Sequence, residues 1–433
     1  MRALFASPAQ VAAATPEDRD RYLDLLRGLA IAVVVLGHWL LAVVWMQDGQ
    51  LRATAVLDAA PATRWVTWIL QVMPLFFLVG GVVNARSWRA ARNAGAVWAA
   101  WVGRRAARLL RPTTVVVWTW VALAAVASAA GVERSLIVLG ARNALIPLWF
   151  LAVYLLLTAA VPALLASYDR LGVGLVAVLL VAAAAVDAAV RAGVPLVGHA
   201  NYALVWAVPV VLGFAWSDGS LDRRAVRIGL PMAALVALVA AVAWLGYPVT
   251  MIRVAEAGGP NVPVVTLALL GCVQAGIALA LRGPVTAWLQ RPGPWAAVVR
   301  INTVAMTVYL WHLTIMVLTI GVLSQTGSWW SVAPLSASWW LTRPLWLTAL
   351  VVVLAPVVVG LVPVEHSVPP ARPHGAGRMA TVGMMAATAT AAGAAAAMTV
   401  GGVLGAPGIA GAVALTAAAR HAGAFGGAGA VAR

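Results

Sequence analysis

The sequence predicts an all-α protein of the membrane, a polytopic bundle of about ten transmembrane helices whose N-terminus is cytoplasmic. Of the 433 residues, 63% are hydrophobic and only 10% are charged, whereas soluble domains average about 25% charged residues. Apolar runs bounded by charges or by Pro and Gly recur along the chain, and each is close to the roughly 20 residues that cross a bilayer. Together these observations exclude a soluble protein.

The ten predicted spans follow one another with short connections. They are expected at residues 23–46, 65–85, 112–131, 145–166, 171–190, 201–217, 228–247, 263–281, 301–323 and 343–363. We therefore predict a cytoplasmic segment at residues 1–22, one membrane domain at 23–363 and an Ala/Gly-rich tail at 364–433. Because the tail is mildly apolar and Pro407 and several glycines interrupt it, an eleventh span there remains open.

The distribution of arginine indicates the orientation of the spans. With the N-terminus in the cytoplasm, 20 arginines fall in inner segments and 7 in outer ones, as the positive-inside rule requires. The outer connections are rich in Trp, as in GSWWSVAPLSASWW, and Trp favours the membrane interface. We therefore expect a multi-pass protein of the plasma membrane. The basic residues are spread over short loops, so a nucleic-acid partner is not expected.

The first span carries ionisable side chains within an apolar run. Eleven residues separate Arg27 from His38, a rise of about 16 Å and a rotation that returns to within about 20° of its start, so both lie on one helix face. Asp24 falls within about 40° of the same line. Polar groups at such depth usually face a cavity, a pathway or a partner. Alternatively, Arg27 extends to the headgroups and His38 bonds to a neighbouring helix.

An inner segment carries a strip of three arginines at helical spacing, namely Arg105, Arg108 and Arg111. Guanidinium groups suit phosphate because they donate paired, charge-assisted hydrogen bonds. The alternative is ordinary inner-face positive charge in contact with anionic lipid. The spacing alone does not decide between the two.

Other spans also carry residues of interest. Gly80 and Gly81 interrupt the second span, where close helix packing explains them more readily than a ligand does. Trp149 stands at the outer start of the fourth span, a position typical of the aromatic belt. His312 lies near mid-membrane in the ninth span, as a structural hydrogen-bonding group or a functional one. The single Cys272 lies in an apolar run, so neither a disulfide nor a cysteine metal site is expected.

Five motifs in order give a more specific indication than any one of them. The segments RYLDLLRGLAIAVVVLGHW, MPLFFLVGG, RRAARLLRP, LWFL and YLWH resemble the acyltransferase 3 family of membrane-bound O-acyltransferases over roughly residues 19–363. The Arg27 and His38 pair is similar to the signature of that family. Two positions depart from the pattern, because Gly80 stands where a Ser is common and Pro147 stands near a position that often holds His.

The resemblance implies transfer of an acyl group, often acetyl, from cytoplasmic acyl-CoA to a hydroxyl of a carbohydrate, a glycolipid or a secondary metabolite. Acyl-CoA is then a co-substrate, and neither a permanent cofactor nor a metal is expected. His38 would be the catalytic base, assisted by Arg27. The CoA phosphates would bind Arg27 and the arginine strip.

The same resemblance assigns the remaining site residues by their depth. Trp149, His312 and Asp24 are expected to bind substrate. Asp187, at the outer end of the fifth span, is the nearest carboxylate by depth and the candidate to orient His38. A second class of function remains open, a proton-coupled transporter or flippase that uses the same Arg and His groups. A third is a structural membrane protein without turnover, in which loss of His38 would harm only folding.

Overall fold

The computed structural model describes residues 4, 6–48, 50–252, 262–325, 332–366 and 378–425. In this part of the chain, 11 helices are long and apolar enough to cross a membrane. Each of the ten predicted spans has a counterpart among them, so the all-α polytopic fold class is confirmed. The tail supplies the eleventh of these candidate helices, at Met379–Gly401.

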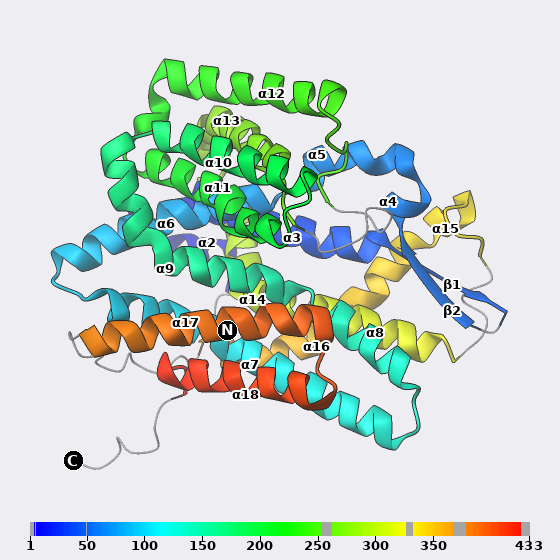
Figure 1. Ribbon diagram of the computed structural model, residues 1–433. Helices are drawn as coiled ribbons and strands as arrows, with labels where there is room; N and C mark the ends of the chain where they lie inside the picture. Colours follow the sequence, from blue (N-terminus) through cyan, green and yellow to red (C-terminus); the bar gives the residue numbers. More distant parts are fainter. Residues whose placement is uncertain are drawn as a thin grey trace, which may run out of the picture. The chain divides into compact units, whose positions relative to one another are not determined.

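The long helices of the first half of the chain are α3 (Arg21–Leu41), α6 (Met73–Asn93), α7 (Trp98–Ala129), α9 (Pro147–Leu171), α10 (Gly174–Arg191) and α11 (Asn201–Ser217). Those of the second half are α12 (Leu230–Trp244), α13 (Val265–Trp288), α14 (Pro292–Leu323), α16 (Arg343–His366), α17 (Arg378–Gly401) and α18 (Gly405–His421). The shorter α-helices are α2 (Pro8–Ala13), α4 (Val56–Ala59), α5 (Thr67–Leu70), α8 (Arg134–Ala144) and α15 (Ala337–Leu341). The described part of the chain also contains three 3₁₀ helices, η1 (Pro61–Val66), η2 (Val197–Ala200) and η3 (Ser220–Asp222), and a π-helix, η4 (Ala225–Gly229). Figure 1 labels most of these elements.

The chain divides into two compact units. Residues 1–87, 160–305 and 332–339 form the first, and residues 88–159, 306–331 and 340–433 form the second. The chain passes from one unit to the other within α6, α9, α14 and α15, and each unit is described by itself below.

Close helix packing organises the first unit. A Cβ atom at Gly81 of α6 would lie 2.2 Å from the backbone oxygen of Val210 in α11. A Cβ atom at Gly213 of α11 would lie 2.3 Å from the backbone oxygen of Leu78. Both separations are far below a van der Waals contact, so the two backbones touch only because glycine stands at both positions. The packing interpretation of Gly81 is thus the one that the structure supports.

The first span is shorter than the apolar run predicts. Helix α3 ends at Leu41, and the chain continues as an antiparallel hairpin of β1 (Ala42–Gln47) and β2 (Gln50–Ala55) (Figure 1). Val43 is buried beside Val56 and Trp339, so burial rather than helical periodicity fixes the start of the hairpin. The predicted range 23–46 was therefore too long at its C-terminal end.

The third span begins earlier than predicted. Helix α7 starts at Trp98 rather than near residue 112, and Pro112 lies inside it. The arginine strip is consequently part of a continuous helix and not of a loop. Proline removes one backbone hydrogen bond, and the helix continues through it to Ala129.

The second unit contains the C-terminal tail. Helices α17 and α18 pack on each other, and both pack on α7 (Figure 1). At one point of this contact the indole Nε1 of Trp118 donates to Thr416 Oγ1 over 2.9 Å. Small residues let the tail helices approach closely, since a Cβ atom at Gly411 of α18 would lie 3.3 Å from the side chain of Met398 and 3.9 Å from the backbone oxygen of Ala394, both in α17. The Ala/Gly-rich composition thus serves helix packing.

Some residues used in the sequence analysis lie outside the described residues. These are Arg2, Arg253, Arg372, Trp329 and Trp330. The cytoplasmic placement of the N-terminus therefore stays a prediction based on the arginine distribution.

Candidate active site

The candidate site begins at the N-terminal end of α3. Asp20 is the N-cap, and its Oδ1 accepts from the backbone N–H of Leu23 over 3.3 Å. A carboxylate at this position satisfies a free N–H group and interacts favourably with the helix dipole. One turn further, the hydroxyl of Tyr22 donates to the carbonyl of Ala278 in α13 over 2.7 Å. These bonds fix the start of α3 within the first unit.

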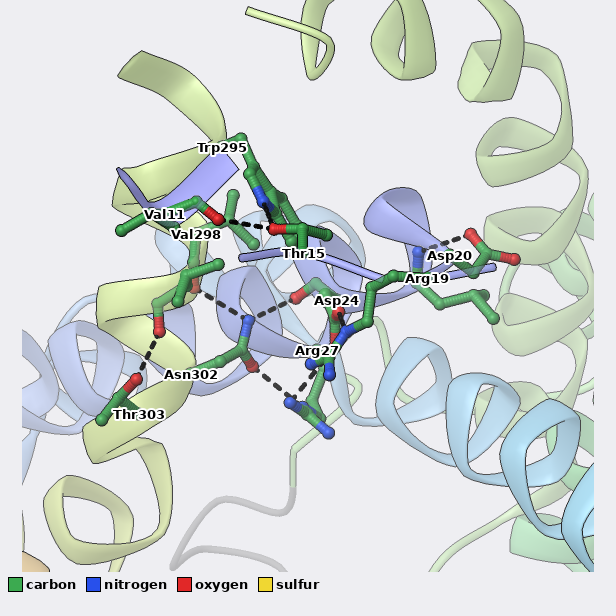
Figure 2. Close-up of polar contacts among 12 residues, drawn as sticks. Val11, Thr15, Arg19, Asp20, Asp24, Arg27, Trp295, Val298, Asn302 and Thr303 are labelled. Atoms are coloured by element: carbon green, nitrogen blue, oxygen red, sulfur yellow. Dashed lines mark hydrogen bonds and ion pairs between the residues drawn. The ribbon is translucent and has the colours of Figure 1, made fainter. Parts of the chain in front are cut away.

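Arg27 is held from two sides. Its Nη2 lies 3.3 Å from Asp24 Oδ1, and its Nε donates to Asn302 Oδ1 over 2.8 Å. The other oxygen of Asp24 pairs with Arg19 Nε at 2.5 Å. Figure 2 shows Asp24 between the two arginines, with Asn302 approaching from α14. The guanidinium of Arg27 is therefore oriented, while 38% of its side chain stays exposed.

Asn302 joins α14 to α3. Its Nδ2 donates to the backbone oxygen of Asp24 over 2.8 Å and to that of Val298 over 3.0 Å (Figure 2). The close approach depends on Gly28, because a Cβ atom there would lie 3.2 Å from both Asn302 and Ile301. The three hydrogen bonds of the Asn302 side chain thus favour one geometry of Arg27.

His38 lies in the last turn of the same helix. Its side chain is half-buried, and the next residue, Trp39, is 2% exposed. Because α3 is continuous, Arg27 and His38 lie about 16 Å apart along its axis. With the helix ending at Leu41, His38 is close to the opposite end of the span, nearer to that surface than the longer predicted helix implied.

The structure gives Asp187, suggested as the group that orients His38, other partners. Both oxygens of Asp187 are used by other groups: Oδ1 accepts from Asn201 Nδ2 at 2.8 Å, and Oδ2 accepts from the Tyr247 hydroxyl at 3.1 Å and from the backbone N–H of Val265 at 2.9 Å. The carboxylate therefore caps the start of α13 and binds the connection before it. Tyr247 lies outside the candidate spans, and burial, followed by the charge of Asp187, raises its pKa to about 12.

The arginine strip lies on α7 in the second unit. Arg108 is exposed, whereas Arg105 and Arg111 are half-buried. The guanidinium of Arg105 stacks over the Trp101 ring with 4.1 Å to its centroid, and such cation–π contact favours a fixed orientation. Arg108 is thus the most accessible member of the strip. Its predicted role in binding phosphate stays a prediction.

Trp149 and His312 also lie in the second unit. Trp149 is half-buried at the start of α9 and contacts Phe150 edge to face, with ring centroids 6.2 Å apart. His312 is 0% exposed, and its Nδ1 lies 2.7 Å from the carbonyl oxygen of Tyr309. A bond to its own helix leaves Nδ1 as the protonated nitrogen. Substrate binding by either residue stays a prediction.

Sequence reasoning missed Asn302 and Arg19. A signal for Asn302 was present, since it is an amide within the apolar run of the ninth span, and polar groups in such runs usually have a partner. Asn302 carries no charge, so it does not stand out among the charged groups and histidines of the spans. Arg19 precedes the span, and the positive-inside rule already explains an arginine at that position without any partner.

These features define a class of protein: a multi-pass helical membrane protein with an arginine and a histidine at opposite ends of one helix. The chain belongs to the acyltransferase 3 family, because the model of its acyltransferase domain matches residues 20–362. The match includes Asp24, Arg27 and His38 and ends before α17. The protein is therefore a multi-pass membrane acyltransferase. Neither the curated proteins nor the solved structures that were compared include a significant match.

Proposed function

We propose that this protein transfers an acyl group, in the first instance acetyl, from cytoplasmic acyl-CoA to a hydroxyl of a carbohydrate or lipid-linked acceptor at the outer face of the plasma membrane. The observation that supports this most is the position of Arg27 and His38 at opposite ends of α3. An oriented, partly exposed guanidinium at the N-terminal end suits an anionic donor. A histidine at the other end suits proton transfer to and from an acceptor.

In the proposed reaction, His38 accepts the proton of the acceptor hydroxyl as its oxygen attacks the thioester carbonyl. A C–O ester bond forms, the C–S bond breaks, and the proton passes from His38 to the leaving thiolate. The products are an O-acylated acceptor and free CoA. Asp24 then acts through Arg27 and Arg19 rather than on the substrate, since both of its oxygens are paired with them.

Radiolabelled acetyl transfer in membranes tests this function. Membranes that contain the protein are expected to move label from acetyl-CoA to an endogenous carbohydrate or lipid fraction, and membranes without it are not. An Arg27→Ala variant at matched expression is expected to lose most of the transfer. Full transfer by this variant would refute the role of Arg27. Absence of both transfer and acyl-CoA binding would favour the transporter class instead.

Asn302 offers a separate prediction about orientation. Replacing it with Leu removes the bond to Arg27 Nε and the bond to the Asp24 carbonyl. Because Arg27 keeps its charge and its pairing with Asp24, we expect a rise of about tenfold in the KM for acyl-CoA with a smaller change in kcat. Steady-state kinetics of the purified variant measure both constants.

Thr303→Val is the matched control for Asn302→Leu. It changes the next residue of α14, whose hydroxyl donates to the backbone of its own helix at Val299 over 2.8 Å (Figure 2). We expect wild-type kinetics from this control. Equal constants for Asn302→Leu and the wild type would contradict the positioning role of the amide.

A further inference from the structure

A cavity of about 530 Å³ opens beside the N-terminal end of α3, within the first unit. Three segments line it: the chain after α2, the start of α3, and the end of α13 with the turn that follows. The lining residues that carry the argument are Arg19, Arg21, Arg282, Glu17, Thr286 and Gln290. The volume lies within the range of small-molecule sites.

Each of the three arginines has at least one fixed contact. Arg19 Nε pairs with Asp24 Oδ2. Arg21 Nη1 donates to the carbonyl of Leu289 over 2.9 Å, and its guanidinium lies 5.1 Å from the centroid of the Trp295 ring. The guanidinium of Arg282 lies over the Trp216 ring, 5.5 Å from its centroid. These contacts orient the three groups and leave further N–H donors of each for a ligand.

The remaining lining groups are polar and of mixed charge. Glu17 adds a carboxylate and Gln290 a side-chain amide, both exposed, and Thr286 adds a hydroxyl. Asp20 also lines the cavity, but its two oxygens accept from the backbone of Leu23 and from Arg86. Three guanidinium donors suit phosphate groups, while a carboxylate and an amide suit the amino and hydroxyl groups of a base and a sugar.

We propose that this cavity binds a nucleotide that carries phosphate on more than one position, with Arg21 and Arg282 on the phosphates and Glu17 or Gln290 on the base or ribose. The inference rests on the proposed function, in which the nucleotide is the adenosine 3′,5′-bisphosphate end of acyl-CoA. The ion pairs from Arg19 through Asp24 to Arg27 connect the cavity to the candidate catalytic helix. The arginine strip of α7 is then not required for this contact.

Calorimetric titration of the purified full-length protein with adenosine 3′,5′-bisphosphate tests the proposal. This probe has neither a thiol nor an acyl group, so binding is measured apart from transfer. Arg282→Gln is the informative variant, because the fixed contact of Arg282 is with an aromatic ring and its loss removes no buried hydrogen bond. We expect its dissociation constant to rise about tenfold or more. Arg224→Gln, an exposed arginine outside the cavity, is expected to bind as the wild type does.

Two further measurements, pyrophosphate competition and phosphatidylglycerol retention, distinguish the nucleotide from other sources of phosphate. Pyrophosphate that competes as well as the nucleotide would indicate a general phosphate site and overturn the proposal. Loss of phosphatidylglycerol retention by Arg282→Gln, with unchanged nucleotide binding, would indicate a lipid headgroup and overturn it as well. Acetyl transfer that persists while Arg282→Gln binds the nucleotide normally would refute the cavity assignment and leave the proposed function standing. Nucleotide binding weakened by Arg282→Gln, without any transfer, would refute the function and retain the cavity.

Discussion

The His38→Ala variant is expected to lose acyl transfer by about 100-fold or more. General acid–base catalysis by a positioned side chain contributes roughly 10²- to 10⁴-fold to a rate, and α3 places no other titratable side chain in the turn that holds His38. Binding of acyl-CoA is expected to remain close to that of the wild type, because Arg27 and its partners lie at the other end of the helix. Transfer kinetics and donor titration on the same preparation measure the two effects.

The matched control is Gly37→Ala. A Cβ atom at Gly37 meets nothing within 4 Å, so the control changes the neighbouring residue without a steric conflict. We expect it to keep wild-type transfer. If His38→Ala retained full transfer in a folded protein, His38 would not be the catalytic base. If it failed to fold, His38→Gln, which keeps a polar side chain of similar length, would separate folding from catalysis.

The Gly213→Val variant is expected to fold poorly or not at all. Its Cβ atom alone would lie 2.3 Å from the Leu78 oxygen and 2.7 Å from the Val82 nitrogen, and both are backbone atoms of α6. A backbone cannot yield as a flexible side chain does, so α6 and α11 must separate. Overpacking typically costs 1–3 kcal/mol, and we expect about 3 kcal/mol or more here. The readout is the monodisperse fraction that survives heating in detergent.

Gly360→Ala is the control for this packing prediction. A Cβ atom at Gly360 of α16 meets nothing within 4 Å. Alanine favours a helix interior over glycine by roughly 0.5–1 kcal/mol, so the control is expected to raise thermal stability slightly. Equal stability of Gly213→Val and the wild type would contradict the close contact of α6 and α11.

Hydropathy was sufficient to predict the spans, because a chain in a bilayer must satisfy its backbone polar groups within helices. It did not predict the helix ends. Val43 and Trp45 are as apolar as the helix before them, yet they begin a hairpin whose pairing with Arg52 and Thr54 is set by tertiary contacts. The early start of α7 was not predicted, because the charged residues of its first turns are more typical of a loop than of a membrane helix.

The site was predictable only in part. Arg27 and His38 were predicted because ionisable groups are costly in an apolar run and usually have a partner or a function there. Their partners come from distant positions, such as Asn302, and a spacing rule within one helix contains no information about them. Asp187 shows the same limit, since its depth suggested a partner for His38 whereas Asn201, Tyr247 and the start of α13 use both of its oxygens.

The central claim is that the acyl donor binds at the Arg27 end of α3 and the acceptor reacts at the His38 end. It is tested most directly in proteoliposomes in which the protein has one orientation. Radiolabelled acetyl-CoA is supplied either on the face that exposes the N-terminus or on the opposite face. The label is then followed into a carbohydrate or lipid-linked acceptor. We predict transfer only when the donor is on the N-terminal face, and its loss in His38→Ala. Transfer from the opposite face alone, or transfer that is independent of His38, would contradict the account.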